Sequence, residues 1–281
     1  MTLYFGDERN ESSPFVVLGF PADFTASFRC GSREAPIRVR EASKFIEFRS
    51  ILTNLNMDDV LYDDVGDVPV VYGDIVSSLR NLETMLLGLE ESKVPIIIGG
   101  EHTLTYSSRV LKYDCLLVFD AHLDLREEYL GYKWSHASWL LRLLETENNL
   151  TVGIYGFRVY DDQEILNGKR NGVDFLFTRS HLNKWLSKCK NGIYVSIDMD
   201  VLDPSIAPGV SNPEPGGLTL HELLAALRDA LSKVPLRGMD VVEVCPPCDK
   251  GNVTSILAAK LIVEVTSLHY AFWIKNKKKL W

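Results

Sequence analysis

The feature that most constrains the fold of this chain is a regular alternation of short apolar runs with helix-like segments. Four runs are apolar at nearly every position, and they span residues 15–20, 94–98, 115–119 and 192–197. Strands of this kind are buried on both faces, which is typical of a parallel sheet covered by helices on each side. No Pro/Gly/Ser-rich linker interrupts the 281 residues, so we expect a single α/β domain over residues 1–281.

Helical spacing of apolar residues predicts several of the segments between the strands. Leucine or isoleucine recurs every three or four residues across positions 74–92. We expect a helix there, a second from Ser135 through Leu144, and a closing helix over residues 252–272. The segment 63–67 holds three aspartates and a glycine, and this composition favours a solvated loop.

Titratable side chains lie at or just past the ends of three of these apolar runs and of a fifth run. They are His102, the group at 120–124, the pair at 198 and 200, and Glu243 near the end of a last run over residues 239–244. In parallel sheets, ligands bind outside the carboxyl ends of the strands. We therefore expect these side chains to meet at one edge of the sheet and to form the functional site.

The densest of these groups has polar side chains at alternate positions, Asp120, His122 and Asp124. Alternate side chains of an extended chain point to the same face, so we expect these three to converge while Ala121 and Leu123 pack inward. Buried charges are costly unless something pairs with them. A divalent cation is the simplest partner.

Six residues are candidate metal ligands, namely His102, Asp120, His122, Asp124, Asp198 and Asp200. Two imidazoles and four carboxylates are more than one small cation uses, and they suit two ions that share bridging carboxylates. Oxygen and imidazole ligands without a thiolate favour Mn²⁺ over a structural Zn²⁺. Two ions about 3.5–4 Å apart can hold a bridging hydroxide that is nucleophilic at neutral pH.

Composition argues against other classes of protein. The formal net charge of −8 is unfavourable for binding nucleic acid, and the basic residues at 275 and 277–279 predict only a solvated tail. We find no apolar run long enough to span a bilayer and no signal-peptide core in the first 14 residues. We therefore expect a cytoplasmic protein with neither a nucleic-acid nor a membrane partner.

The five cysteines are an odd number and mostly scattered, which does not indicate a secreted disulfide framework. Cys245 and Cys248 form a CxxC motif, which suits either a redox pair or half of a zinc site. The chain has no second pair to complete a zinc site. A thioredoxin-like chain would carry the motif early in the fold and near a helix start.

Taken together, the motifs resemble those of the ureohydrolase family, the arginases and agmatinases. The matching stretches are Gly-Gly-Glu-His at 99–102, Phe-Asp-Ala-His-Leu-Asp at 119–124, Ser-His-Ala at 135–137, Ser-Ile-Asp-Met-Asp-Val-Leu-Asp-Pro at 196–204 and Gly-Met-Asp-Val-Val-Glu at 238–243. They occur in family order and cover nearly the whole chain. The resemblance implies an arginase-like three-layer α/β/α sandwich with a mainly parallel sheet, and a binuclear manganese centre. It also implies hydrolysis of a guanidinium group to urea and an amine.

The resemblance also implies a role for each candidate ligand. One Mn²⁺ ion would take His102, Asp120, Asp124 and Asp198. The other would take His122, Asp120, Asp198 and Asp200. Asp120 and Asp198 would then bridge the two ions. 

Two further residues match functional positions of the family. Glu243 matches the carboxylate that grips the guanidinium group, where a bidentate, charge-assisted pair is expected. His136 matches a mobile histidine proposed to shuttle a proton to the leaving amine or to bulk water.

The stretches at 125–134 and 207–214 are similar to agmatinases rather than to the arginase loop. They imply hydrolysis of agmatine to putrescine and urea, a step of polyamine biosynthesis. Asp161 falls where the family can place an acid for the distal amine, although an acid at a helix N-terminus explains it equally well. Arg126 would repel a cationic tail or bind an acidic one. This leaves aminopropylagmatine, guanidinobutyrate, arginine and formiminoglutamate as alternative substrates.

The resemblance bears on the assembly as well. Family members form homo-oligomers, so a trimer or hexamer is implied, with a small guanidino compound as the other partner. One departure is Glu101, which stands where many relatives have aspartate.

Overall fold

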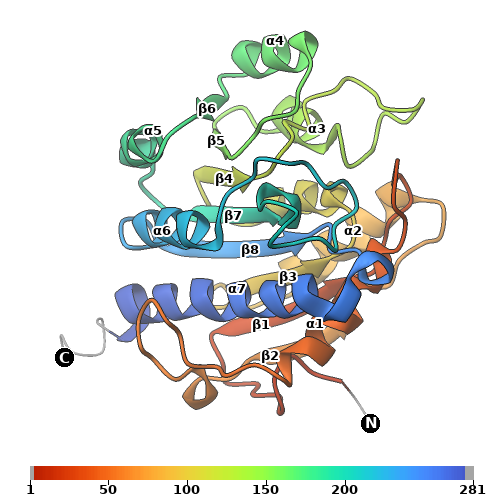
Figure 1. Cartoon of the computed structure of the whole chain (residues 1–281). Coiled ribbons are helices and arrows are strands. Elements are labelled where there is room, and N and C mark those ends of the chain that lie inside the picture. The colour runs from red at the N-terminus through yellow and green to blue at the C-terminus, as the bar shows by residue number, and fades with distance from the viewer. Residues whose placement is uncertain (1–2, 276–281) are drawn as a thin grey trace.

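A single sheet of eight strands forms the centre of the computed structural model, which describes residues 3–275 (Figure 1). The strands are β1 (Phe15–Phe20), β2 (Asp63–Asp67), β3 (Val94–Gly99), β4 (Cys115–Phe119), β5 (Thr151–Tyr155), β6 (Asp174–Leu176), β7 (Ile193–Asp198) and β8 (Leu236–Val242). Their spatial order is β2-β1-β3-β8-β7-β4-β5-β6, and each neighbouring pair is parallel. The predicted parallel sheet is confirmed.

Alternate residues of the strands enter two separate apolar cores. In β1, Phe15 and Val17 belong to one core, whereas Val16 and Leu18 belong to the other. Both faces of the sheet are therefore buried, which is why the strands are apolar at every position.

Helices cover the two faces of the sheet (Figure 1). One face packs against α1 (Ala35–Ser43), α5 (Arg179–Trp185), α6 (Leu220–Leu231) and α7 (Val253–His269). The other face packs against α2 (Ile75–Leu87), α3 (Trp139–Thr146) and a 3-10 helix, His102–Val110. The remaining helix, α4 (Asp162–Arg170), lies at the β6 end of the sheet. This is the expected three-layer α/β/α sandwich.

The prediction of a solvated loop at residues 63–67 is wrong, because this segment is the edge strand β2. Asp64 is buried, and its carboxylate accepts hydrogen bonds from Arg40 Nε at 2.7 Å and Nη2 at 2.9 Å. It also accepts one from the backbone N–H of Phe5 at 2.7 Å. A buried arginine thus neutralises an acid that composition alone places at the surface.

Several helix boundaries differ from those expected. Helix α2 ends at Leu87 because Gly88 follows, whereas we expected it to reach residue 92. Helix α3 begins at Trp139 rather than at Ser135, because the Ser138 hydroxyl accepts the Ser135 N–H and holds this stretch in a turn. Helix α7 ends at His269 and continues as a π-helix, Tyr270–Lys275.

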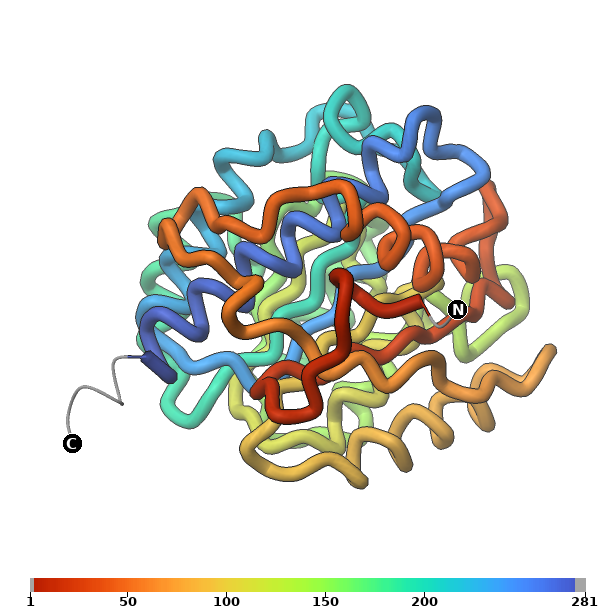
Figure 2. The backbone as a smooth tube through the Cα atoms, turned by 90° about the horizontal axis from the view of Figure 1, so that it is seen from below, coloured from red at the N-terminus to blue at the C-terminus, as the bar shows by residue number. Residues whose placement is uncertain are grey.

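The helical stretch Lys250–Lys275 has 26 residues and is long and apolar enough to cross a membrane. The expectation that no apolar run has this length is therefore wrong. The protein itself buries 72% of the most apolar window, and α7 packs against α1 and α6. The carboxylate of Glu264 in α7 accepts a hydrogen bond from Ser50 Oγ at 2.6 Å, and Figure 2 shows the loop after α1 beside this helix. These are the properties of a helix in the core of a large domain.

The structure pairs Cys115 with Cys189, which the scattered spacing of the cysteines does not predict. This disulfide joins the first residue of β4 to the segment before β7. Cys30, Cys245 and Cys248 are free. The basic tail predicted at residues 277–279 lies outside the described residues.

Candidate metal centre

Four neighbouring strands deliver the titratable side chains to one edge of the sheet. Strands β3, β8, β7 and β4 are adjacent in that order. His102 follows β3, Glu243 follows β8, Asp198 ends β7 and Asp120 follows β4. The carboxyl ends of these strands therefore bring together residues that are far apart in the sequence.

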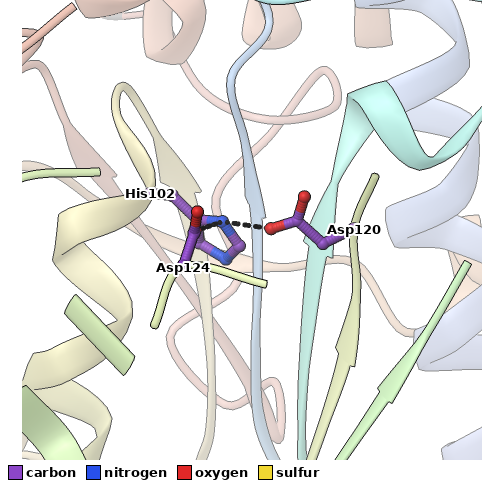
Figure 3. A group of neighbouring side chains, drawn as sticks. All are labelled: His102, Asp120 and Asp124. Carbon is purple, nitrogen blue, oxygen red and sulfur yellow. Dashed lines mark ion pairs between the residues drawn. The ribbon is translucent and has the colours of Figure 1, made fainter. Parts of the chain in front are cut away.

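The first group of potential ligands surrounds Nδ1 of His102 (Figure 3). This nitrogen lies 3.0 Å from Asp120 Oδ2, 3.1 Å from Asp124 Oδ2 and 3.4 Å from Asp198 Oδ2. The opposite ring nitrogen, Nε2, lies 2.8 Å from Ser196 Oγ, which orients the imidazole. Nδ1 is buried and has no hydrogen-bond partner, although three carboxylates face it. A buried nitrogen in this position is suited to ligating a cation that the carboxylates share.

The second group lies around His122. Its Nδ1 is 3.0 Å from Asp200 Oδ2 and 3.4 Å from Asp120 Oδ1. Each group could hold a metal ion, and Asp120 is the residue common to both. Both groups offer only carboxylate oxygen and imidazole nitrogen, which fits hard or borderline divalent cations such as Mn²⁺.

The chain reaches this arrangement by a turn rather than by the extended path that we expected. The N–H of His122 donates to Asp120 Oδ1 at 2.6 Å, and Asp124 adopts a left-handed backbone with φ of 53°. Trp139 Nε1 donates to Asp124 Oδ2 at 2.7 Å and holds that carboxylate toward His102. A non-glycine residue in this conformation is strained, and such strain is concentrated at functional sites.

Asp198 contacts the first group without being one of its three members. Its Oδ1 accepts the N–H of Asp200 at 2.8 Å, while its Oδ2 faces His102. The structure thus brings all six predicted ligands together. The bridging role implied for Asp198 stays a prediction.

The crowding of these charged side chains shifts the pKa values of Asp198 and His102. Burial, and then the charges of Asp200 and Asp120, raise the pKa of Asp198 well above its usual range. Burial would lower the pKa of His102, but the carboxylates of Asp120, Asp124 and Asp198 raise it well above the ordinary value. The carboxylates therefore stabilise positive charge at this point, which is what a site for divalent cations requires.

Glu243 is tied directly to a candidate ligand. Its Oε1 accepts the N–H of His102 at 2.8 Å, and its own N–H donates to the carbonyl of Gly100 at 2.9 Å. Its backbone φ is 63°, a second left-handed residue at the site. Burial raises the pKa of Glu243 to about 8, so a cationic partner would favour the ionised carboxylate.

His136 lies in the loop before α3 and is nearly buried. Its Nδ1 is 3.1 Å from Thr25 Oγ1, and its Nε2 is 3.4 Å from Ser27 Oγ. Its ring packs edge-on against that of Tyr129, with the centroids 5.5 Å apart. Burial lowers the pKa of His136, which favours the neutral imidazole at neutral pH.

Arg126 lies beside Tyr129 and pairs with Asp161. The Arg126 guanidinium lies 5.0 Å from the Tyr129 ring centroid, and its Nη1 is 3.5 Å from Asp161 Oδ2. Asp161 also caps α4, because its Oδ1 accepts the N–H of Glu164 at 2.9 Å. The helix-capping role of Asp161 is thus confirmed, while its substrate-binding role and that of Arg126 stay predictions.

Sequence reasoning missed several residues that hold the site in place. The Arg158 Nη2 atom donates to the carbonyls of Asp200 and Glu214, each at 2.7 Å, and so fixes the loop after β7. Asp240 accepts a hydrogen bond at 2.6 Å from Ser196 Oγ, the atom that contacts Nε2 of His102. The only sequence signal for Asp240 was its position inside the motif at 238–243, and Arg158 lies outside the quoted motifs.

The comparisons with known proteins agree with this geometry. The family model described as arginase family matches residues 13–267. The agmatinase of Bacillus subtilis is 35% identical over 265 residues, covering 91% of each chain. The N(1)-aminopropylagmatine ureohydrolase of Thermococcus kodakarensis is 30% identical over 260 residues, covering 90% of this chain and 89% of that protein.

A solved structure, the agmatine ureohydrolase of Thermoplasma volcanium, superposes with a TM-score of 0.81 at 30% identity, covering 93% of this chain and 92% of the other. The chain therefore belongs to the arginase family. It is a ureohydrolase, that is, a hydrolase that acts on guanidino compounds.

Proposed function

We propose that this protein hydrolyses agmatine to putrescine and urea with two Mn²⁺ ions. The observation that carries the proposal is the hydrogen bond from the His102 N–H to Glu243 Oε1. It places a carboxylate able to pair with a guanidinium group directly beside the candidate metal centre. The identity to agmatinases supports the choice of agmatine.

The six residues of the two groups would hold the ions, with Asp120 shared between them. Divalent ions bound there would lower the pKa of water enough to supply a hydroxide nucleophile at neutral pH. Four carboxylates and one hydroxide against two divalent ions would leave a net charge of about −1, which attracts a cationic guanidinium.

We expect Glu243 to bind and orient the guanidinium group of the substrate. A carboxylate can accept two parallel N–H bonds from a guanidinium, and this fixes the plane of the group. The backbone N–H of His102 holds Glu243 from behind, so the orientation is set before the substrate enters.

His136 transfers the proton that the leaving amine needs. In its neutral form it can take a proton at one ring nitrogen and pass it to the leaving amine. Thr25 and Ser27 contact its two ring nitrogens and so fix the orientation of the ring.

The rest of the substrate would extend past Tyr129, because this ring contacts both His136 and Arg126. The carboxylate of Asp161 would then pair with the distal ammonium of agmatine, which would replace Arg126 as its partner.

The same ion pair favours a second candidate function. With Arg126 in place, a tail that carries a carboxylate would be bound better than an ammonium, as in guanidinobutyrate, arginine or formiminoglutamate. Aminopropylagmatine, with its longer cationic tail, is a further alternative in view of the Thermococcus relative.

Urea release from a panel of these compounds by the Mn²⁺-loaded protein tests the proposal. We expect the highest kcat/KM with agmatine. In Arg126→Gln, kcat/KM should rise or hold for agmatine and fall for the carboxylated compounds. The matched control is Arg38→Gln, which removes an exposed arginine paired with Glu41 on α1. Preference for a carboxylated compound that is lost in Arg126→Gln would reject agmatine in favour of the second candidate.

A cytoplasmic location and a trimeric or hexameric assembly complete the proposal. Both stay predictions, and fractionation with sedimentation analysis would test them.

A further inference from the structure

The Cys245-Pro-Pro-Cys248 motif begins two positions after Glu243 in the chain. The two Sγ atoms lie 2.8 Å apart as free thiols. The N–H of Cys248 donates to the carbonyl of Cys245 at 2.9 Å, which closes the motif into a tight turn. A disulfide has its sulfurs about 2.0 Å apart, so bond formation needs an approach of roughly 0.8 Å. The motif is thus nearly in position to close.

A zinc site is the weaker explanation of this motif. Within residues 3–275, the two groups of residues that could hold a metal ion contain no cysteine. The third free cysteine, Cys30, contributes only its backbone carbonyl, which accepts from Cys245 Sγ at 3.5 Å.

On one side, the start of the motif and the residues before it are hydrogen-bonded to the loop at residues 209–211. The N–H of Cys245 donates to the carbonyl of Gly209 at 2.8 Å, and the N–H of Ser211 donates to the carbonyl of Glu243 at 3.1 Å. These bonds hold Val244, the single residue between Glu243 and Cys245, and its two neighbours. A change in the turn is therefore transmitted to the backbone of the residue that grips the guanidinium group.

On its other side the motif packs against the loop after β1. Gly31 has a φ of 126°, and a Cβ atom there would lie 2.5 Å from Pro247 Cγ, so this contact is close. The same loop carries Thr25 and Ser27, which contact both ring nitrogens of His136. The motif thus lies between the supports of Glu243 and the loop that holds His136.

We propose that Cys245 and Cys248 form a reversible disulfide by exchange with a low-molecular-weight disulfide such as glutathione disulfide, and that this lowers guanidinium binding at Glu243. The effect on binding rests on the proposed function, whereas disulfide formation does not. In the exchange, the Cys248 thiolate attacks one sulfur of the oxidant and releases one thiol. The Cys245 thiolate then attacks Cys248 Sγ and releases the second thiol. The protein loses two electrons and two protons, and the oxidant gains them.

The two cysteines differ in a way that fits this order. Cys248 is partly exposed and can meet the oxidant, whereas Cys245 is buried. Burial, and then the neighbouring Cys248 thiol, raise the pKa of Cys245 to about 12. Cys248 is therefore the thiol that attacks first.

The bond would change contacts on both sides of the motif. It removes the Cys245 thiol hydrogen, for which the Cys30 carbonyl at 3.5 Å and Cys248 Sγ at 2.8 Å are the two acceptors, and it shortens the turn. We expect KM for the guanidino substrate to rise about tenfold, the size of effect that follows when one hydrogen bond to a charged group is disturbed.

In the test, the Mn²⁺-loaded protein is equilibrated at graded ratios of reduced to oxidised glutathione. The remaining free thiols are then alkylated and identified by peptide mass analysis. We expect Cys245 and Cys248 to lose alkylation together and to regain it with dithiothreitol. KM for agmatine should rise and fall with the bond while the bound Mn²⁺ stays constant.

Two variants make the result specific. Cys248→Ser should abolish the KM response, and Cys30→Ser should retain it. The proposal is overturned if Cys245 and Cys248 both stay alkylatable at a glutathione ratio that already glutathionylates Cys30. It is also overturned if the disulfide forms without a change in KM, or if Cys30→Ser removes the response. Absence of urea from the fully reduced protein would instead reject the proposed function, because the alkylation result is independent of activity.

Discussion

Asp120 places its Oδ2 atom 3.0 Å from Nδ1 of His102. Its other oxygen, Oδ1, lies 3.4 Å from Nδ1 of His122, so one carboxylate faces both groups of potential ligands. Asp124, in contrast, belongs only to the group of His102. The two aspartates therefore differ in how many ions they can ligate.

Metal stoichiometry tests this difference. We predict about two Mn²⁺ per chain for the unaltered protein, because each of the two groups could hold one ion and Asp120 is shared between them. Asp120→Asn should hold fewer than one ion, whereas Asp124→Asn should keep about one in the group of His122. Elemental analysis after dialysis measures this. Asp174→Asn, which alters a carboxylate paired with Lys188 away from the site, is the control. Two ions retained by Asp120→Asn would contradict the shared-ligand arrangement.

Arg158 provides a second prediction. Its guanidinium donates to the backbone carbonyls of Gly156, Asp200, Val201, Glu214 and Pro215. A lysine cannot reproduce this planar set of donors, so Arg158→Lys should loosen the loop that carries Asp200. We expect Mn²⁺ affinity at the group of His122 to fall about tenfold, as when supports of metal ligands are removed.

Competition with a chelator measures this affinity for each ion. Arg109→Lys is the matched control, because Arg109 pairs with Glu83 elsewhere in the fold. An equal loss of affinity for both ions would show that Arg158 acts on the whole fold rather than on this group.

Glu164 makes stability depend on pH. Burial raises its pKa from 4.5 to about 7, so the folded state favours the neutral acid more than the unfolded state does. This contribution to stability is complete below about pH 4.5 and is lost as the pH rises through about 7. The loss is on the order of 3 kcal/mol at most, from the size of the shift.

Glu164→Gln should remove this pH dependence. Denaturant unfolding of both proteins between pH 4.5 and 8 gives the difference in their free energies of unfolding. We expect that difference to shift in favour of the glutamine variant as the pH rises. A difference that stays constant over this range would contradict the raised pKa of Glu164.

The strand ends could be predicted from the sequence because each depends on neighbouring residues. An apolar run and the ligand that follows it, as at β4 and Asp120, are adjacent in the chain. The parallel order of β3, β8, β7 and β4 then brings the ligands together without further information. This is why the six ligands and the fold could be inferred together.

The errors arise where a distant partner decides the local structure. Strand β2 looked like a solvated loop because the partner of Asp64 is Arg40, on a helix earlier in the chain. The turn that carries His136 depends on Thr25, more than a hundred positions away. The left-handed backbone of Asp124 has no sequence signature, since glycine is the residue that usually adopts it.

The most direct test of the central claim is the rate of urea release from agmatine as Mn²⁺ is added to metal-free protein. Putrescine and bound Mn²⁺ are measured in the same samples. We predict urea and putrescine in equal amounts, a rate that rises until about two ions are bound per chain, and activity near background in Asp120→Asn. Protein that holds two Mn²⁺ ions and releases no urea from agmatine would contradict the proposed function.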